Sequence, residues 1–188
     1  ESRDGASKGK ALLALDLALK TGWAAGIPCG PVSHGSFKLH GTADPARLLE
    51  MVREVTALLD RFNVTHMVAE APFIGKRRNT AMALYGYRAA AMIACANKKV
   101  RVHDLVEPSK IRKHFIGAGG LKRADAKSAV IEKCQWRGWN PANDDEADAL
   151  ALWDYQCALL DPNHFTMGMR RNAWATTLTT SSAGSASG

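Results

Sequence analysis

The chain has 188 residues, the usual size of one domain, and 46% of them are hydrophobic, which is enough to bury a core. Its formal net charge is +7, from 25 Lys and Arg against 18 Asp and Glu, which favours an acidic partner such as nucleic acid or an anionic membrane surface. The four cysteines are widely spaced, and no apolar run approaches the roughly 20 residues of a membrane-spanning helix, so we expect no zinc site and no membrane segment, but reduced thiols in the cytoplasm.

Three short strands are predicted near the beginning of the chain. The run ALLALDL at 11–17 is apolar enough to be a buried strand, and 22–27 and 33–39 are two more strands, separated by turns that contain Pro and Gly. Three consecutive short strands indicate an antiparallel meander. The polar, aperiodic segments 1–10 and 166–188 are expected to be flexible tails, which leaves one domain at 11–165.

Helices and strands alternate after this meander. Asp44 as a capping residue and Pro45 in the first turn precede apolar residues at helical spacing as far as Phe62, which predicts an amphipathic helix. Further strands are predicted at 63–70 and 99–105, and further helices at 79–97, 108–117, 124–136 and, after the cap Asn143, to about Leu160. This order predicts an α/β fold with a mixed five-stranded sheet, a three-strand antiparallel meander plus parallel strands, and helices on both faces, as in the RNase H-like fold.

Two acidic residues occupy unusual positions in the predicted strands. Asp16 lies inside an apolar strand, where an ionised carboxylate needs compensation by a cation, hydrogen-bond donors or a cleft at the strand end. Glu70 ends a later apolar strand, a position where α/β proteins tend to place functional groups. Taken singly, Asp16 also fits a turn cap and Glu70 an ordinary exposed strand end.

The last predicted helix begins with a cluster of acids. Asp145 and Asp148 lie three residues apart and share one helix face, while Asp144 and Glu146 point elsewhere. Acids in a first helical turn are favoured by the helix dipole whatever their role. Four acids within five residues nevertheless exceed what capping requires, which makes Asp145 and Asp148 candidates for a shared site.

The positive charge is concentrated in one segment of the chain. Between Lys98 and Arg137 there are eleven Lys and Arg against four Asp and Glu, so this segment accounts for the whole net charge of +7. A glycine-rich stretch at 117–120 lies within it but lacks a Gly-Lys-Ser/Thr ending, so no nucleotide cofactor is expected. A solvated basic face would explain the charge as well as DNA binding does. The candidates for contacts with DNA phosphates are Lys110, Arg112, Lys113, Lys122, Arg123 and Lys127.

A second basic segment follows Glu70. It consists of Lys76, Arg77 and Arg78, and the preceding Phe73 has an aromatic ring that could stack on an unpaired base. An ordinary charged surface loop explains the same residues equally well. Both interpretations stay open at this point.

The combination of these features resembles the RuvC-like Holliday junction resolvases of the RNase H-like superfamily. The resemblance covers about Leu12 to Tyr155 and rests on the order and spacing of LALDLALKTGWA, MVAEAPF, PSKIRKHFIGAGGLKRADAKSAV and DDEADALAL. Leu17-Ala18 stands where a Pro-Gly pair usually follows the first Asp, so the chain is closest in pattern to diverged, phage-type members.

The resemblance implies a crossover junction endodeoxyribonuclease that cuts four-way or related branched DNA. It implies Arg112 and Lys127 as basic residues near the scissile phosphate, and Phe73 as a residue beside the junction. Oxygen-only ligands suit Mg²⁺ or Mn²⁺. Two such ions about 4 Å apart hydrolyse a phosphodiester to 5′-phosphate and 3′-hydroxyl ends. The four metal ligands implied are Asp16, Glu70, Asp145 and Asp148.

The resemblance also implies a homodimer, because a two-fold symmetric junction requires two paired active sites. The resemblance further implies that the protein acts in the cytoplasm of a bacterial or phage-infected host cell. Small residues in the helix at 79–97 would allow close approach of a second subunit, but they also suit packing on the sheet. The six histidines are scattered and receive no role, and Trp136, Trp139 and Trp153 are expected in the core.

Two alternatives to a junction resolvase remain. One is a looser nuclease for flaps, forks or single strands, which the missing Pro-Gly pair favours. The other is a non-catalytic junction-binding protein that retains the basic surface. The intact acids at all four positions argue against the second alternative.

Overall fold

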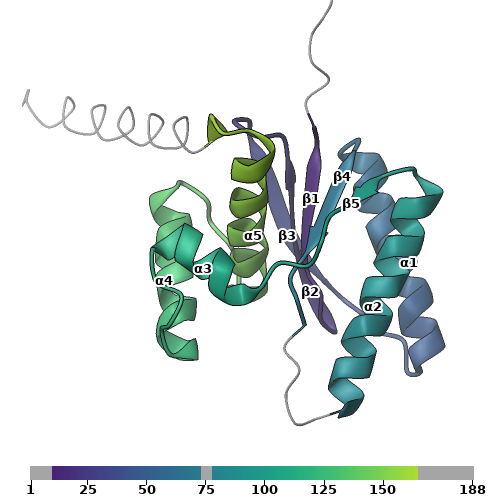
Figure 1. The fold of residues 1–188 in the computed structure, drawn as a ribbon. Helices are drawn as coiled ribbons and strands as arrows, with labels where there is room; N and C mark the ends of the chain where they lie inside the picture. Colours follow the sequence, from purple (N-terminus) through teal and green to yellow (C-terminus); the bar gives the residue numbers. More distant parts are fainter. Residues whose placement is uncertain (1–9, 73–77, 165–188) are drawn as a thin grey trace, which may run out of the picture.

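A mixed sheet lies at the centre of the fold in the computed structural model, which describes residues 10–72 and 78–164 (Figure 1). Within these residues the sheet has five strands in the order β3-β2-β1-β4-β5. The pairs β1/β2 and β2/β3 are antiparallel, whereas β1/β4 and β4/β5 are parallel, which confirms the predicted meander and parallel strands. The strands are β1 (Leu12–Asp16), β2 (Lys20–Gly26), β3 (Val32–Lys38), β4 (His66–Ala69) and β5 (Arg101–Val102).

Helices cover both faces of the sheet, as predicted. In Figure 1, α1 and α2 lie on one side of the sheet, and α3, α4 and α5 lie on the other. None of the helices in the described residues is long and apolar enough to cross a membrane. Their bounds are α1 (Asp44–Arg61), α2 (Arg78–Asn97), α3 (Pro108–Ile116), α4 (Arg123–Trp136) and α5 (Asp144–Leu160).

The central strand β1 is buried on both faces. Successive side chains of a strand point to opposite sides, so Leu13 and Leu15 pack into the core under α1 and α2. Leu12 and Ala14 pack into the second core, under α3, α4 and α5. This two-sided burial explains why the sequence of β1 is a continuous apolar run and not an alternating pattern.

Two predicted boundaries are wrong in detail. The N-cap of α1 is Ala43, and Asp44 lies in the first turn, where its charge interacts favourably with the helix dipole without capping a backbone amide. The strand predicted at 99–105 pairs regularly only at Arg101–Val102. The amide of His103 donates to the carbonyl oxygen of Met67, and the amide of Val106 donates to that of Ala69. The three residue steps from His103 to Val106 therefore lie opposite only two steps on β4, and the ladder is interrupted as in a bulge.

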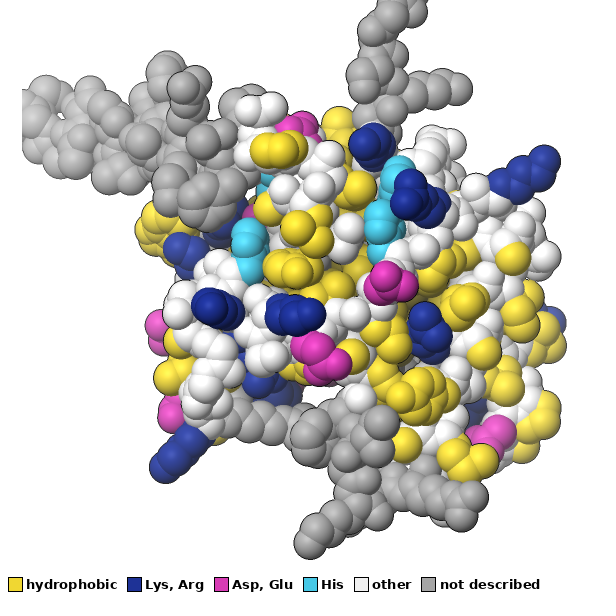
Figure 2. Space-filling model, viewed as in Figure 1, with side chains coloured by type: hydrophobic (Ala, Val, Ile, Leu, Met, Phe, Trp, Pro, Cys, Tyr) yellow, Lys and Arg dark blue, Asp and Glu magenta, His cyan; other side chains and the backbone are white. Residues whose placement is uncertain are grey.

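Several small residues of α2 pack within the subunit. A Cβ atom added at Gly86 would come within 3.2 Å of Leu48 on α1, so the glycine allows the two helices to approach closely. Ala90 and Ala94 are buried in the core beneath α1 and α2. On the face shown in Figure 2, hydrophobic side chains gather on the side where Figure 1 places α1 and α2. The large exposed hydrophobic residues of α2 are Met82, Tyr85, Met92 and Ile93.

Candidate active site

Two of the predicted acids lie side by side at the carboxyl ends of neighbouring parallel strands. Asp16 is the last residue of β1, and Glu70 follows β4 directly. The register pairs Leu15 with Ala69, and the amide of Glu70 donates a hydrogen bond to the carbonyl oxygen of Leu15 at 3.2 Å. The parallel pairing therefore brings together two carboxylates that are far apart in the sequence.

The start of α5 brings the other two acids to the same place. Gly22 of β2 pairs with Asp16, and a Cβ atom at Gly22 would overlap the carbonyl oxygen of Asp145. Only a residue without a side chain lets the first turn of α5 lie this close to the sheet. In the sequence, Gly22 only begins a predicted strand, and no local signal reveals this role.

All four acids line one cleft of about 950 Å³. Arg112 of α3 and Lys127 of α4 line it as well. Two further arginines, Arg47 and Arg88, line the cleft from α1 and α2, and the sequence interpretation did not name them. Since α1 and α2 cover the other face of the sheet, cationic residues line the cleft from helices on both faces. The acids that line it are Asp16, Glu70, Asp145 and Asp148, together with Asp44 at the rim.

The acids of the cleft are difficult to ionise together. Burial, and then the charges of Asp148 and Asp145, raise the pKa of Asp16 to about 7. Burial, followed by the charges of Asp16 and Asp148, raises the pKa of Glu70 to about 8. Burial also raises the pKa of Asp148. A set of desolvated like charges of this kind is stabilised by a cation placed among them.

Two lysines interact with acids at the start of α5. Lys20 Nζ lies 3.2 Å from Asp145 Oδ2, and Lys127 donates a hydrogen bond to Asp144. The hydrogen bond from Lys127 lowers the pKa of Asp144. Lys20 was not among the predicted site residues, because its position at the start of β2 gives no sequence signal for a partner on α5.

The donor set of the cleft suits a hard divalent cation. Four carboxylates with no sulfur or imidazole are the kind of ligands that Mg²⁺ and Mn²⁺ prefer. Within the described residues, no three Asp, Glu, His or Cys side chains lie close enough together to share one ion as they stand. Carboxylates repel one another without a cation, and Lys20 holds one of them, so binding an ion requires these side chains to turn inward.

The other predicted DNA-binding residues fall into two groups. Lys110, Lys113 and Lys122 are exposed on α3 and at the N-cap of α4, outside the lining of the cleft. Of the remaining predicted contacts, Phe73, Lys76 and Arg77 lie outside the residues that the structure describes. For Arg78 and Arg123 it describes the backbone but not the side chain.

The basic segment of the sequence does not form one continuous surface. Lys98, Lys99 and Arg101 follow the carboxyl end of α2, whereas Asn79 and Thr80 at its amino end line the cleft. A helix of 20 residues is about 30 Å long, so these three cations lie at the opposite end of the molecule. Lys98 forms an ion pair with Asp60 there, at 2.7 Å. The described cations of this segment are therefore not gathered in one place.

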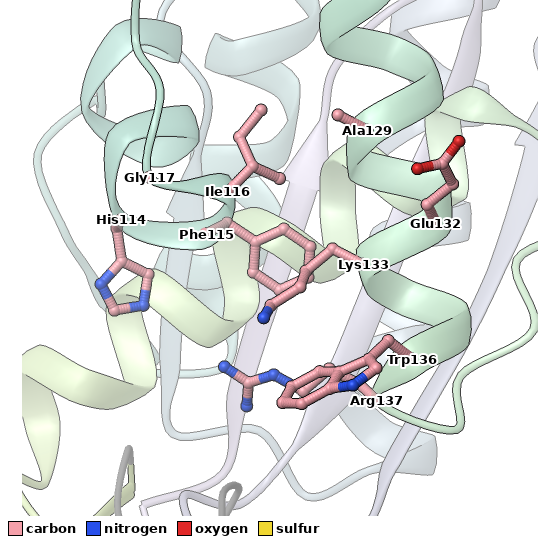
Figure 3. A pocket seen from close by; sticks show the side chains of 9 residues that line it. All are labelled: His114, Phe115, Ile116, Gly117, Ala129, Glu132, Lys133, Trp136 and Arg137. Atoms are coloured by element: carbon pink, nitrogen blue, oxygen red, sulfur yellow. The ribbon is translucent and has the colours of Figure 1, made fainter.

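A separate hollow of about 680 Å³ lies between α3 and α4 (Figure 3). Trp136 is 55% exposed beside it, with the amine of Lys133 3.8 Å from the centre of an indole ring, so the prediction that this tryptophan is in the core is wrong. Trp153 is buried, as predicted. Trp136 escapes burial because α4 packs on α5 through its other face, which carries Val130 and Cys134.

A buried carboxylate cluster lies near this hollow. Asp154 of α5 is 1% exposed, and its carboxylate contacts Arg137 at 3.1 Å, His114 at 3.0 Å and His164 at 3.1 Å. The sequence interpretation gave the histidines no role. In the structure, two of them serve to satisfy this buried charge.

The chain is similar in sequence to a known protein family and to a member of that family. The family model for RuvC, crossover junction endodeoxyribonuclease, matches residues 24–153. The crossover junction endodeoxyribonuclease RuvC of Chloroflexus aurantiacus is 29% identical over 112 residues, which cover 60% of this chain and 67% of that protein.

Solved structures of similar fold include two Holliday junction proteins. Thermus thermophilus RuvC in complex with Holliday junction substrate has a TM-score of 0.64 at 18% identity and covers 76% of this chain and 90% of its own. The yeast mitochondrial Holliday junction resolvase Ydc2 has a TM-score of 0.54 at 10% identity, with 84% and 85% covered. These structures confirm the fold. Since the family model spans more than half of the chain, the protein belongs to the RuvC family of crossover junction endodeoxyribonucleases.

Proposed function

We propose that this protein is a metal-dependent, structure-selective endonuclease that resolves four-way (Holliday) or related branched DNA. The observation that carries the proposal is the single cleft into which β1, β4 and α5 bring Asp16, Glu70, Asp145 and Asp148 in a chain of the RuvC family. Branched DNA as the substrate is supported by the similar Thermus thermophilus protein, whose structure contains a Holliday junction. The two-sided cationic cleft suits a substrate with phosphates on both sides.

In this proposal the four acids bind two Mg²⁺ ions, and Mn²⁺ can substitute for Mg²⁺. Ions held there would supply an activated water and charge stabilisation for the leaving oxygen, the chemistry that gives 5′-phosphate and 3′-hydroxyl ends. Arg112 and Lys127 line the same cleft and hold the scissile phosphate by charge-assisted hydrogen bonds. The contact with Asp144 keeps the Lys127 amine at the start of α5, next to the metal ligands.

The exposed lysines of α3 and α4 are proposed to position the DNA. Lys110, Lys113 and Lys122 neutralise backbone phosphates, which adds affinity without sequence preference. We keep Phe73, Lys76, Arg77, Arg78 and Arg123 as proposed contacts on the strength of the sequence alone. The catalytic domain is proposed to extend over 11–165, since both cores lie within this range.

A homodimer is part of the proposal, because both strands of a junction must be cut. Gly86, Ala90 and Ala94 of α2 pack inside the subunit, so a second subunit would contact the outer face of the helix. That face exposes Met82, Tyr85 and Ile93, large apolar side chains of the type found at the centre of interfaces.

A looser nuclease is kept as the second candidate function. Leu17 and Ala18, which replace the usual Pro-Gly pair, line the cleft directly beside Asp16. A change at this point of the cleft alters the surface that meets the DNA and so bears on which DNA shapes fit.

The test is a nicking assay on a synthetic four-way junction, a fork, a flap, a linear duplex and a single strand, each with Mg²⁺, Mn²⁺, Ca²⁺ or EDTA. We expect cleavage of the junction in Mg²⁺ and Mn²⁺, and a loss of rate on the order of 10³-fold in Asp16→Asn. Equal cleavage of all shapes would favour the looser nuclease. A wild-type rate in Asp16→Asn would overturn the proposed active site.

A further inference from the structure

Two acids of the α5 motif, Asp144 and Glu146, do not line the cleft, and Glu146 is the one that is buried. Glu146 lies between Asp145 and Asp148 in the sequence, is only 6% exposed and is absent from the lining of the cleft. Its side chain points towards β3. Its sequence position predicts that Glu146 points away from the face shared by Asp145 and Asp148, and in the structure it contacts β3.

Both carboxylate oxygens of Glu146 have hydrogen-bond partners. Oε1 accepts from the Ser36 hydroxyl and from the Asn143 side-chain amide, each at 3.1 Å. Oε2 accepts from the backbone amide of Ala142 at 3.1 Å and lies 3.0 Å from His34 Nδ1. Four partners around two oxygens satisfy a buried carboxylate and leave it fixed in one orientation.

The cluster connects α5 to a strand that carries no cleft acid. His34 and Ser36 lie two residues apart on β3 and so point to the same face of the sheet. Asn143 is the N-cap of α5, where its side-chain oxygen accepts from the amide of Glu146 at 3.0 Å. The cap and the first turn of α5 are thereby fastened to β3.

The sheet register places this contact between α5 and β3 directly across β2 from Asp16 on β1. Ser36 of β3 pairs with Gly22 of β2, and Gly22 pairs with Asp16 of β1. The first turn of α5 crosses the sheet over Gly22, the position without a side chain. It is therefore held on one side by Glu146 on Ser36, while Asp145 and Asp148 line the cleft together with Asp16 on the other.

We propose that Glu146 is a positioning residue: with His34, Ser36 and Asn143 it fixes the first turn of α5 over Gly22 so that Asp145 and Asp148 can bind divalent ions together with Asp16. This inference rests on the proposed function for the ions themselves. Glu146 is not a ligand, because its oxygens are already occupied by hydrogen bonds. Its effect on the site passes through the helix backbone.

Mn²⁺ affinity of the metal-free protein, measured without DNA by the electron paramagnetic resonance signal of free Mn²⁺, tests this role. We expect affinity to fall 10- to 100-fold in Glu146→Ala, which is the usual range for residues that orient metal ligands. Glu146→Gln keeps one acceptor oxygen and should fall less. Ser36→Ala removes one hydrogen bond without changing any charge, and a loss of several-fold is expected.

The matched control is Glu107→Gln. Glu107 is an exposed acid whose charge acts on Glu70, so its removal measures the effect of one lost negative charge near the cleft, and a change below twofold is expected. All measurements are made well below the Tm of each variant. Affinities in Glu146→Ala and Ser36→Ala equal to that of Glu107→Gln would overturn the positioning role.

The two proposals fail in different ways. If Asp16→Asn loses junction cleavage while Glu146→Ala keeps wild-type Mn²⁺ affinity, the proposed function stands and the positioning role is wrong. If Glu146→Ala and Ser36→Ala lose Mn²⁺ affinity in a chain that cuts no branched DNA, the positioning role stands and the proposed function is wrong.

Discussion

Helix α5 carries buried carboxylates at both ends, and their electrostatic states are opposite. Near its start, burial raises the pKa of Asp148, as it does for the neighbouring Asp16. Near its other end, burial would also raise the pKa of Asp154, but hydrogen bonds from His114 and His164 and the charge of Arg137 outweigh it and hold this pKa well below its usual range. On one helix, the surroundings therefore disfavour the ionised form of Asp148 and favour the ionised form of Asp154.

The difference lies in the partners that the chain supplies. Asp154 is surrounded by its own cation and two imidazoles, so its charge is complete within the fold. The cleft acids repel one another, and the nearby lysines pair with Asp144 and Asp145 while Asp16 and Glu70 keep raised pKa values. Burial alone therefore does not mark a functional acid. A set of buried acids left without enough cations is what marks a site for an added one.

The largest effect on stability is expected for Asp154→Ala. This change leaves the Arg137 guanidinium buried without its carboxylate, which costs on the order of 3–5 kcal/mol. Thermal unfolding should show a Tm lower by roughly 10 °C. Asp60→Ala, which breaks the exposed ion pair with Lys98, is the control and should cost less than about 1 kcal/mol. Equal losses in the two variants would remove the distinction between a satisfied buried acid and a surface one.

The opposite sign is expected for Asp16→Asn. Removing a desolvated charge that is repelled by Asp148 and Asp145 should stabilise the metal-free protein at pH 8, on the order of 1–3 kcal/mol. Urea unfolding in EDTA measures this gain. A destabilised variant, similar to Asp154→Ala, would show that Asp16 is a structural acid.

Much of the fold could be predicted from the sequence because local patterns encode it. Periodicity located α1, the cap Asn143 located the start of α5, and the meander followed from three short strands. The shortened β5 could not be found this way, because the interruption depends on which amides of His103 and Val106 reach β4. Edge strands are defined by such pairing more than by their composition.

The candidate site was predictable for the same reason in part. The acids at strand ends and at a helix start have local signatures, and the structure places Asp16, Glu70, Asp145 and Asp148 in one cleft. Contacts over long sequence distances have none: Lys20 with Asp145, and Glu146 with His34 and Ser36, lie more than 100 residues apart. Only the folded chain shows which polar residues are partners.

A pH titration of the free energy of unfolding tests the difference between the cleft acids and Asp154. The folded-state pKa values of Asp16 and Glu70, about 7 and about 8, exceed those of the unfolded chain, so the stability present at low pH is lost as pH rises through these values. Metal-free protein should lose up to about 1.4 kcal/mol per pH unit for each group, from pH 5 to about 7 for Asp16 and to about 8 for Glu70. In Asp16→Asn the loss should be smaller.

Saturating Mg²⁺ should flatten the same profile, because it stabilises the ionised acids. Asp154 behaves in the reverse sense: its lowered pKa means that its stabilising contribution is lost only as pH falls below about 4, the ordinary range of an unfolded Asp. A profile of metal-free protein that is flat from pH 5 to 8 would contradict the raised pKa values of the cleft.

The smallest expected effect is on DNA binding, and it compares a lysine near the cleft with a lysine at the other end of the molecule. Lys122 is exposed next to Leu121, which lines the cleft, whereas Lys98 lies beyond the far end of α2. Lys122→Gln should weaken junction binding in Ca²⁺ by two- to tenfold and reduce the slope of log K against log salt by about 1, because one phosphate contact is lost. Lys98→Gln changes the net charge equally but should leave the slope unchanged. If both variants shift the slope alike, the DNA extends over both ends of the molecule, and the cleft is not the centre of its binding surface.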